Sequence, residues 1–202
     1  MRPPRALYCE FPLGRPLGKP GDASFQRRVL LAALALLARP EGPVLEDYPE
    51  RIEDGSASPL ACALPPRYDP DLPPAVDEAR GLRAAYDRQL RGSGRTTVGQ
   101  AVAADGIPDA VAAVVRIAEG TPLEEAGLPG STRAVGLDIR AYYEEAALAL
   151  ADHVPGARQA ESWFFRQTET GKMLKRAQAA LRESGAREPV WRFFVPATQQ
   201  DT

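Results

Sequence analysis

Histidine and cysteine are scarce in this sequence, and their scarcity excludes several kinds of site. The 202 residues include one histidine and two cysteines, Cys9 and Cys62. A structural zinc site takes four Cys or His ligands, and a disulfide scaffold needs many more cysteines. No Glu stands three residues before His153, the spacing that a helical carboxylate metal site requires. We therefore expect no metal and no cofactor. We also expect both cysteines to be free thiols in a reducing cytoplasm.

An excess of charge and a long apolar run are also missing. The chain has 25 Lys and Arg against 27 Asp and Glu, so we expect neither nucleic acid nor an anionic membrane as a partner. The charge-free run at residues 29–38 is too short to cross a bilayer, which takes ~20 residues. Arg27 and Arg28 before this run resemble an export signal. The run lies behind a strand-like segment without a small-x-small cleavage site, so we expect no export.

The residues that are abundant predict an α/β fold that is mostly helical. Hydrophobic residues make up 44% of the chain, enough for a core, and 20 prolines interrupt it. We expect a small sheet of two or three strands, about 5–11, 43–46 and 190–195, with a layer of several helices. Residues 1–40 form a strand-loop-helix unit, 41–73 a proline-rich connecting arm, and 74–202 a helical region with a C-terminal strand that packs with residues 1–40 as one domain.

Apolar spacing and helix signals place the helices. The expected ranges are 24–38, 75–90, 96–104, 107–118, a short turn after the capping box at 121–124, 133–153 and 156–184. Six aromatic residues near the end of the chain are expected in the core: Trp163, Phe164, Phe165, Trp191, Phe193 and Phe194. Phe165 and Phe194 fall on faces that could instead mark an interface. Glu144 and Glu145 are interpreted as a solvated helix face.

The first candidate site is the loop at residues 12–22, between the first strand and the first helix. Gly14 and Gly18 let the backbone approach a ligand, Arg15 and Lys19 offer charged donors, and amides near Ser24 begin a helix. A carboxylate, a phosphate or an acidic side chain of a partner would suit this arrangement. The alternative is a turn that only joins strand to helix, because the spacing matches neither common phosphate-binding motif.

Cys9 is the second candidate. It lies near the C-terminal end of the first strand, beside the loop cations, and nearby positive charge lowers a thiol pKa and increases its reactivity. The alternative is a small buried hydrophobic residue, which is the commonest environment of a cysteine that forms no disulfide.

The first fifth of the chain resembles a known family. The motif is Ala-Leu-Tyr-Cys-Glu-Phe-Pro-Leu-Gly-Arg-Pro-Leu-Gly-Lys-Pro-Gly-Asp at 6–22, followed by Gln-Arg-Arg-Val-Leu at 26–30. It resembles a segment near the C-terminus of the selenoprotein B component of glycine, sarcosine, betaine and D-proline reductases. The resemblance covers residues 4–40, and it carries over Leu13, Gly14, Gly18 and Lys19. The Cys-x-x-Cys or equivalent redox pair has no counterpart here.

The resemblance implies a subunit of a cytoplasmic reductase complex that cleaves a carbon–heteroatom bond, with the catalytic residues mainly on a partner chain. The alternatives are an independent enzyme that uses the Cys9 thiol, and a non-catalytic interaction scaffold. Because residues 29–38 carry no charge on any face, we expect this helix to be covered by a partner protein or by a second copy of the chain.

Overall fold

The chain forms two compact units. The computed structural model describes residues 4–11, 16–19, 21–50, 52, 60–151, 155, 157–196 and 199. Unit 1 comprises residues 1–58 with 156–158, and unit 2 comprises residues 59–155 and 159–202. Residues 41–50 and 52, from the expected connecting arm, therefore belong with the N-terminal strand and helix. The expectation that residues 1–40 and 74–202 pack as one domain stays a prediction.

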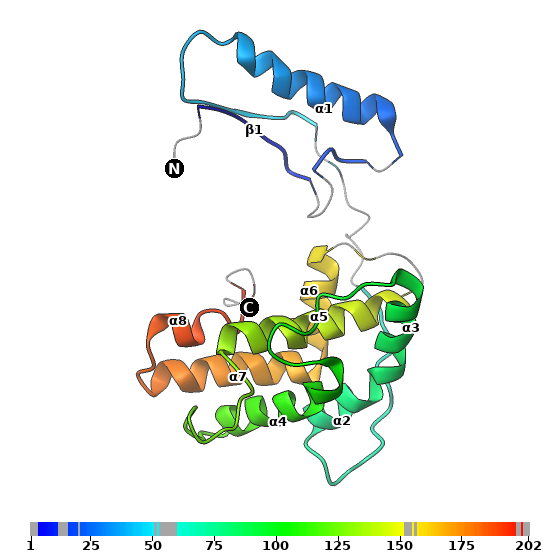
Figure 1. Cartoon of the computed structure of the whole chain (residues 1–202), viewed down its shortest axis with the longest axis vertical. Coiled ribbons are helices and arrows are strands. Elements are labelled where there is room, and N and C mark those ends of the chain that lie inside the picture. The colour runs from blue at the N-terminus through cyan, green and yellow to red at the C-terminus, as the bar shows by residue number, and fades with distance from the viewer. Residues whose placement is uncertain are drawn as a thin grey trace. The chain divides into compact units, whose positions relative to one another are not determined.

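The described chain is mostly helical with one small sheet, as the sequence predicts (Figure 1). Unit 1 contains β1 (Arg5–Tyr8), α1 (Ala23–Ala35), the 3-10 turn η1 (Leu36–Ala38) and β2 (Val44–Asp47). Unit 2 contains α2 (Pro74–Gly81), α3 (Arg83–Ser93), η3 (Ala104–Gly106), α4 (Ile107–Ala118), α5 (Thr132–Leu150), α6 (Ala157–Gln167), α7 (Glu169–Glu183) and α8 (Glu188–Trp191).

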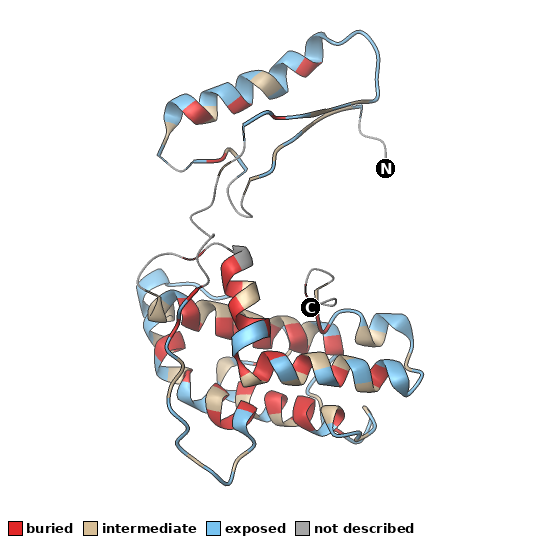
Figure 2. Ribbon diagram, turned by 180° about the vertical axis from the view of Figure 1, so that it is seen from behind, coloured by how far each residue is buried: buried red, intermediate tan, exposed pale blue. Residues whose placement is uncertain are grey.

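Unit 1 is a β-α-β arrangement around a small core. β1 and β2 pair in parallel, with Leu7 opposite Glu46 and Ala6 opposite Leu45. Phe25 and Val29 of α1 pack against Tyr48 after β2. These three are the buried residues of the main cluster of unit 1. Most of α1 is exposed to solvent (Figure 2). The first two expected strands and the helix at 24–38 are thus confirmed.

The third expected strand, at residues 190–195, is wrong. The segment begins with α8, and Pro189 in the first turn fixes the backbone in a helical conformation. Phe194 and Val195 are both buried, so the alternation that a strand requires is absent. Phe194 lies against Gly136 of α5, which leaves room for its ring. The sheet among the described residues therefore has two strands.

Three expected helices also differ from the structure. The helix at 75–90 is divided at Leu82 into α2 and α3, and the one at 156–184 is divided at Thr168 into α6 and α7. The Thr168 side chain accepts the Gly171 N–H and so begins a new helix. Residues 96–103 form irregular backbone instead of a helix, and the amides of residues 99–102 bind Asp138.

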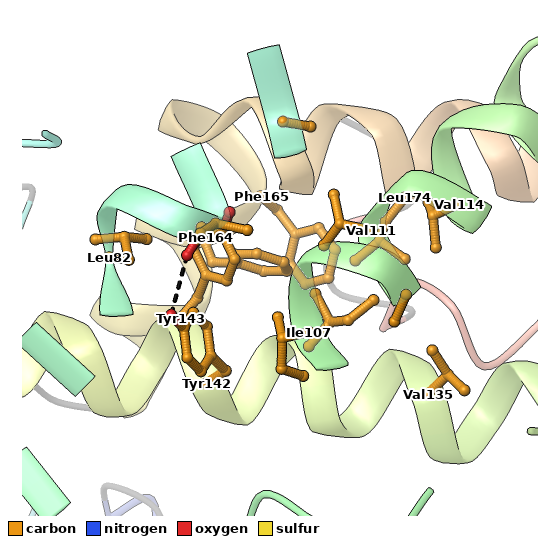
Figure 3. Packing of buried hydrophobic residues seen from close by; sticks show 14 of the residues in the cluster. Leu82, Ile107, Val111, Val114, Val135, Tyr142, Tyr143, Phe164, Phe165 and Leu174 are labelled. Carbon is orange, nitrogen blue, oxygen red and sulfur yellow. Dashed lines mark hydrogen bonds between the residues drawn. The ribbon is translucent and has the colours of Figure 1, made fainter. Parts of the chain in front are cut away.

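The core of unit 2 is continuous and rich in aromatic residues (Figure 3). α4 packs against α7, α2 packs against both, and α5 lies along α3. Tyr143 lies with its ring centroid 5.0 Å from that of Phe164, and Phe164 lies 4.8 Å from Phe165. Phe165 and Phe194 are therefore core residues, and the interpretation of these two as an interface is wrong. No helix within the described ranges has the length and apolar character that would span a bilayer.

Candidate interaction site

The predicted ligand loop lies in unit 1, and the structure describes part of it. Gly14 and Arg15 lie outside the described residues. Gly18 has a φ of 87°, and a Cβ there would lie 2.3 Å from the Phe25 ring and 2.8 Å from Ile52. Gly18 is thus required by packing, because any side chain would displace Phe25.

Asp22 occupies the helix start at which an anion was expected. Its carboxylate accepts the Phe25 N–H at 2.9 Å and the Ser24 hydroxyl at 2.8 Å. The pKa of Asp22 lies below its ordinary value, first because of the Phe25 N–H and then because of the Ser24 hydroxyl. The α1 N-terminus and Ser24 therefore already hold a carboxylate of the same chain.

Lys19 and Arg28 both contact the aromatic ring of Phe25. The Lys19 Nζ lies 5.4 Å from the Phe25 ring centroid, and the Arg28 guanidinium carbon lies 5.3 Å from it. Arg28 also donates to both Glu50 carboxylate oxygens at 3.1 and 3.0 Å, and the Tyr48 hydroxyl donates to Oε1 at 2.9 Å. These contacts direct Lys19 and Arg28 toward groups of the chain itself.

Cys9 is half-buried at the end of β1, beside the core cluster of unit 1. Burial raises the pKa of its thiol above the ordinary value. A reactive cysteine needs the opposite shift, which a helix N-terminus or a neighbouring cation supplies. This environment favours the protonated thiol at neutral pH.

The clearest feature of unit 1 is apolar surface that nothing described covers. On the outer face of α1 and η1, four leucines are exposed: Leu30 by 47%, Leu31 by 55%, Leu34 by 58% and Leu37 by 69%. The inner face, with Phe25 and Val29, is buried. The helix is therefore apolar on both faces, as its lack of charge predicts.

The sheet of unit 1 is bare on the face away from α1. Leu7 packs into the core, so by alternation Ala6 and Tyr8 face the other way, and the register adds Leu45 to that side. Tyr8 is 57% exposed and Leu45 is 69% exposed. Parallel sheets have both faces covered in nearly all proteins, so this surface is unusual. The sequence pattern did not indicate it, because β2 is too short to show which side of it is covered.

Both strand edges are open among the described residues. The backbone bonds from Val44 N–H to the Pro4 carbonyl and from Tyr48 N–H to the Tyr8 carbonyl join even-numbered residues. By alternation, Arg5 and Leu7 direct their backbone groups away from β2, and Leu45 directs its own away from β1. Open edges are templates for pairing with another strand.

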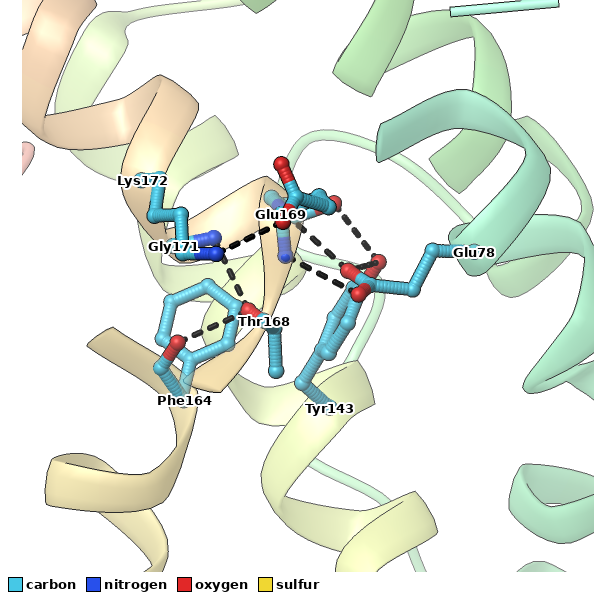
Figure 4. A network of polar contacts seen from close by, with 8 residues as sticks. Glu78, Tyr143, Phe164, Thr168, Glu169, Gly171 and Lys172 are labelled. Carbon is cyan, nitrogen blue, oxygen red and sulfur yellow. Dashed lines mark hydrogen bonds and ion pairs between the residues drawn. The ribbon is translucent and has the colours of Figure 1, made fainter. Parts of the chain in front are cut away.

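Unit 2, in contrast, uses buried carboxylates to bind its own backbone amides. Glu78 on α2 accepts the Glu169 and Thr170 N–H groups at the start of α7, at 2.9 and 3.1 Å, and the Tyr143 hydroxyl at 3.0 Å (Figure 4). One carboxylate thus joins α2, α5 and α7 and caps a helix from a distance. Sequence reasoning missed Glu78, because it lies on an otherwise ordinary helix.

Asp138 performs a similar function on α5. Its buried carboxylate accepts the four backbone N–H groups of residues 99–102 at 2.7–3.0 Å. Burial alone acts to raise the pKa of Asp138, but the four amides outweigh it and the pKa lies below its ordinary value. The signal in the sequence was an acidic residue between Leu137 and Ile139 in an apolar stretch.

The interpretation of Glu144 and Glu145 as a solvated face is wrong. Glu145 accepts the Thr97 N–H at 2.8 Å and the Thr96 hydroxyl at 2.7 Å, so it fixes the adjacent loop. Glu144 lies 3.1 Å from Arg140, and burial raises its pKa to about 7, although Arg140 lowers it. His153 lies outside the described residues. Among the described residues no group of three or more His, Cys, Asp or Glu side chains could hold a metal.

A groove of about 570 Å³ runs along α7, lined by Lys175, Gln178, Arg182, Trp191 and other residues. The Arg182 guanidinium lies 5.5 Å from the Trp191 ring, and Gln178 donates to the Trp191 carbonyl at 3.2 Å. These polar groups attach α8 to α7. The uncovered surface of unit 1 is therefore the better candidate for binding.

Comparisons of the chain with protein-family models, with curated proteins and with solved structures find no match. The resemblance of residues 4–40 to selenoprotein B therefore stays a prediction.

Proposed function

We propose that this chain is an assembly subunit whose unit 1 contributes an incomplete β-α-β arrangement to a complex. The observation that carries the proposal is the two-stranded parallel sheet, which has open edges and exposes Tyr8 and Leu45 on one face. A two-stranded sheet is marginal by itself in water, and a partner strand would supply the missing hydrogen bonds.

The more specific proposal is that the partner is a catalytic chain of a reductase in the glycine and D-proline reductase class. It rests on the resemblance of residues 4–40 alone. In that complex this chain would bind and position, and the partner would supply the selenocysteine or cysteine. A cytoplasmic location suits this role, because neither Cys9 nor Cys62 forms a disulfide.

The experiment has two stages. The tagged full chain is used to isolate partners from its native cells, and each candidate is then purified and its affinity for the full chain is measured. We expect one stoichiometric partner whose binding protects the outward amides of Arg5, Leu7 and Leu45 from hydrogen exchange. We expect Leu45→Arg to weaken binding at least about tenfold.

Leu148→Arg is the matched control, because Leu148 is an exposed leucine of unit 2. Binding that ignores Leu45→Arg and leaves β1 and β2 unprotected would contradict the proposal, as would the absence of any stoichiometric partner. A partner without a redox-active cysteine or selenocysteine in its peptides would contradict only the reductase assignment.

A further inference from the structure

The proline-rich arm expected at residues 41–73 ends in a loop that belongs to unit 2. Residues 64–73 are Leu-Pro-Pro-Arg-Tyr-Asp-Pro-Asp-Leu-Pro, and they lead directly into α2. We call this segment the proline loop. Its residues are exposed or of intermediate burial, as Figure 2 shows for the loop before α2. Since the loop lies in unit 2, its properties do not depend on the sheet of unit 1.

Tyr68 is the most exposed residue of its kind in the described chain. Its side chain is 93% exposed, more than any other large hydrophobic side chain among the described residues. Tyrosine rings are enriched at the energetic centres of protein interfaces, where they bury a large area. A ring this exposed is therefore a candidate anchor for a partner.

The backbone around Tyr68 is held in place by a buried carboxylate of α2. Asp77 is 6% exposed, and its carboxylate accepts the Tyr68 N–H at 2.8 Å and the Asp69 N–H at 3.2 Å. The Arg67 guanidinium donates to two carbonyls of the same loop at 2.9 and 2.7 Å. These four bonds fix the loop from within the chain, so the Tyr68 ring is presented from a defined backbone.

Two prolines set the shape of the chain that leads to Tyr68. Pro65 and Pro66 each fix φ at about −65°, and a residue that precedes a proline favours an extended conformation. A Cβ at Gly81 would lie 2.7 Å from the Pro65 ring, so Pro65 packs closely on α2. Pro66 is exposed. The segment thus has the extended character of a polyproline II ligand and is attached to the fold on both sides of Pro66.

We propose that the proline loop binds an aromatic-lined groove of a partner protein, with Tyr68 as its anchor. Extended proline-rich segments bind such grooves because they lose little conformational entropy when they are covered. Here the fold has already ordered the segment through Asp77 and Arg67. A loop that is ordered before it binds has less to lose on binding, so this loop should bind more tightly than the same residues in a free peptide.

Fluorescence anisotropy with a purified WW domain tests the proposal, because the groove of that domain is lined by aromatic residues and binds proline-rich segments. The domain is one that takes Pro-Pro-x-Tyr peptides, the pattern of residues 65–68. The full chain is titrated into the labelled domain, and we expect a dissociation constant below about 100 µM. Tyr68→Ala should raise this constant at least about tenfold. Phe193→Ala, the matched control, removes another exposed ring of unit 2 and should leave the constant unchanged.

A synthetic peptide of residues 63–73 separates the effect of the fold from that of the sequence. The peptide has the same side chains but lacks Asp77, so we expect the full chain to bind at least about threefold more tightly. Asp77→Ala in the full chain should reduce the affinity to that of the peptide, and circular dichroism shows whether this variant is folded. The comparison of peptide and full chain does not depend on the folding of any variant.

Four results would overturn the proposal. The first is no binding of the full chain at concentrations up to about 500 µM. The second is equal binding by Tyr68→Ala. The third is a free peptide that binds as tightly as the full chain, which would show that the fold does not present the loop. The fourth is a folded Asp77→Ala variant with undiminished affinity. None of these results bears on the partner of the sheet in unit 1.

Discussion

Unit 2 and unit 1 use similar proportions of apolar residues in opposite ways. Unit 2 places most of its aromatic residues inside, and carboxylates such as Glu78 and Asp138 bind the backbone amides that its helix starts and loops expose. Unit 1 buries Phe25, Val29 and Tyr48 in its main cluster and leaves four leucines of α1 and η1, together with Leu45, exposed. A closed core and an exposed apolar surface therefore occur in one polypeptide.

The largest effect should come from the core of unit 2. Phe164→Ala removes a fully buried ring and should lower the free energy of unfolding of that unit by about 3–5 kcal/mol. Urea unfolding followed by tryptophan fluorescence reports this unit specifically, because both Trp163 and Trp191 lie in it. Phe193→Ala, at an exposed ring, is the control, and an equal loss there would contradict the packing described.

A second substitution tests whether the smaller core is closely packed. Gly18→Ala adds a Cβ that meets Phe25 and Ile52 at a φ of 87°, so it should destabilise unit 1 by about 2–3 kcal/mol. Gly21→Ala is the matched control, since its φ is 77° but nothing lies within 4 Å of the added Cβ. Hydrogen exchange of α1 amides measures the difference, and equal exchange in the two variants would show that Gly18 is required by φ alone.

A third prediction concerns the stability of unit 2 at low pH. The pKa of Asp138 is lower in the folded state than in the unfolded state. The contribution of Asp138 to stability is therefore complete above its unfolded-state pKa and is lost as pH falls through its folded-state pKa. Unit 2 should therefore lose stability below about pH 4. Asp138→Asn should cost about 1–3 kcal/mol at neutral pH.

Asp138→Asn should also make the free energy of unfolding depend less on pH, which urea unfolding between pH 3 and 7 measures. A neutral-pH stability equal to that of the unchanged chain would mean that the amides of residues 99–102 do not need the carboxylate.

The smallest effect should come from the exposed leucines of unit 1. Leu37→Ser in the dilute chain should change the stability of unit 1 by less than about 0.5 kcal/mol, because Leu37 is already exposed. Thermal unfolding followed by circular dichroism at low concentration makes the measurement. A large loss would show that Leu37 is covered within the chain and would remove the contrast between the two units.

Local signals in the sequence predicted much of this fold. Asp22 and Ser131 cap helices, and Pro74 lies at the start of another, and these are signals that depend only on neighbours within a few residues. The strand predicted at 190–195 does not form, because the packing of Phe194 against α5 outweighs strand propensity. The start of α7 also depends on Glu78, which accepts the Glu169 and Thr170 N–H groups from a helix distant in sequence, and a single window of residues does not show such a contact.

The candidate site was predicted in part, for the same reason. The absence of charge from residues 29–38 correctly indicated a helix without a polar face, since that is a property of one segment. The contacts of Gly18 with Ile52 and of Arg28 with Glu50 join residues more than twenty positions apart. These contacts form only in the folded chain, so no local pattern in the sequence indicates them.

The order of the elements along the chain matters during synthesis. The ribosome releases α1 first, while α2 waits for the amides of Glu169 and Thr170 that Glu78 binds. At about 5–20 residues per second, those amides emerge roughly seven to twenty-seven seconds after α1. Throughout that interval the nascent polypeptide displays the exposed leucines of α1 and η1 before unit 2 has folded, so cells that make it in quantity should depend on a chaperone that shields them.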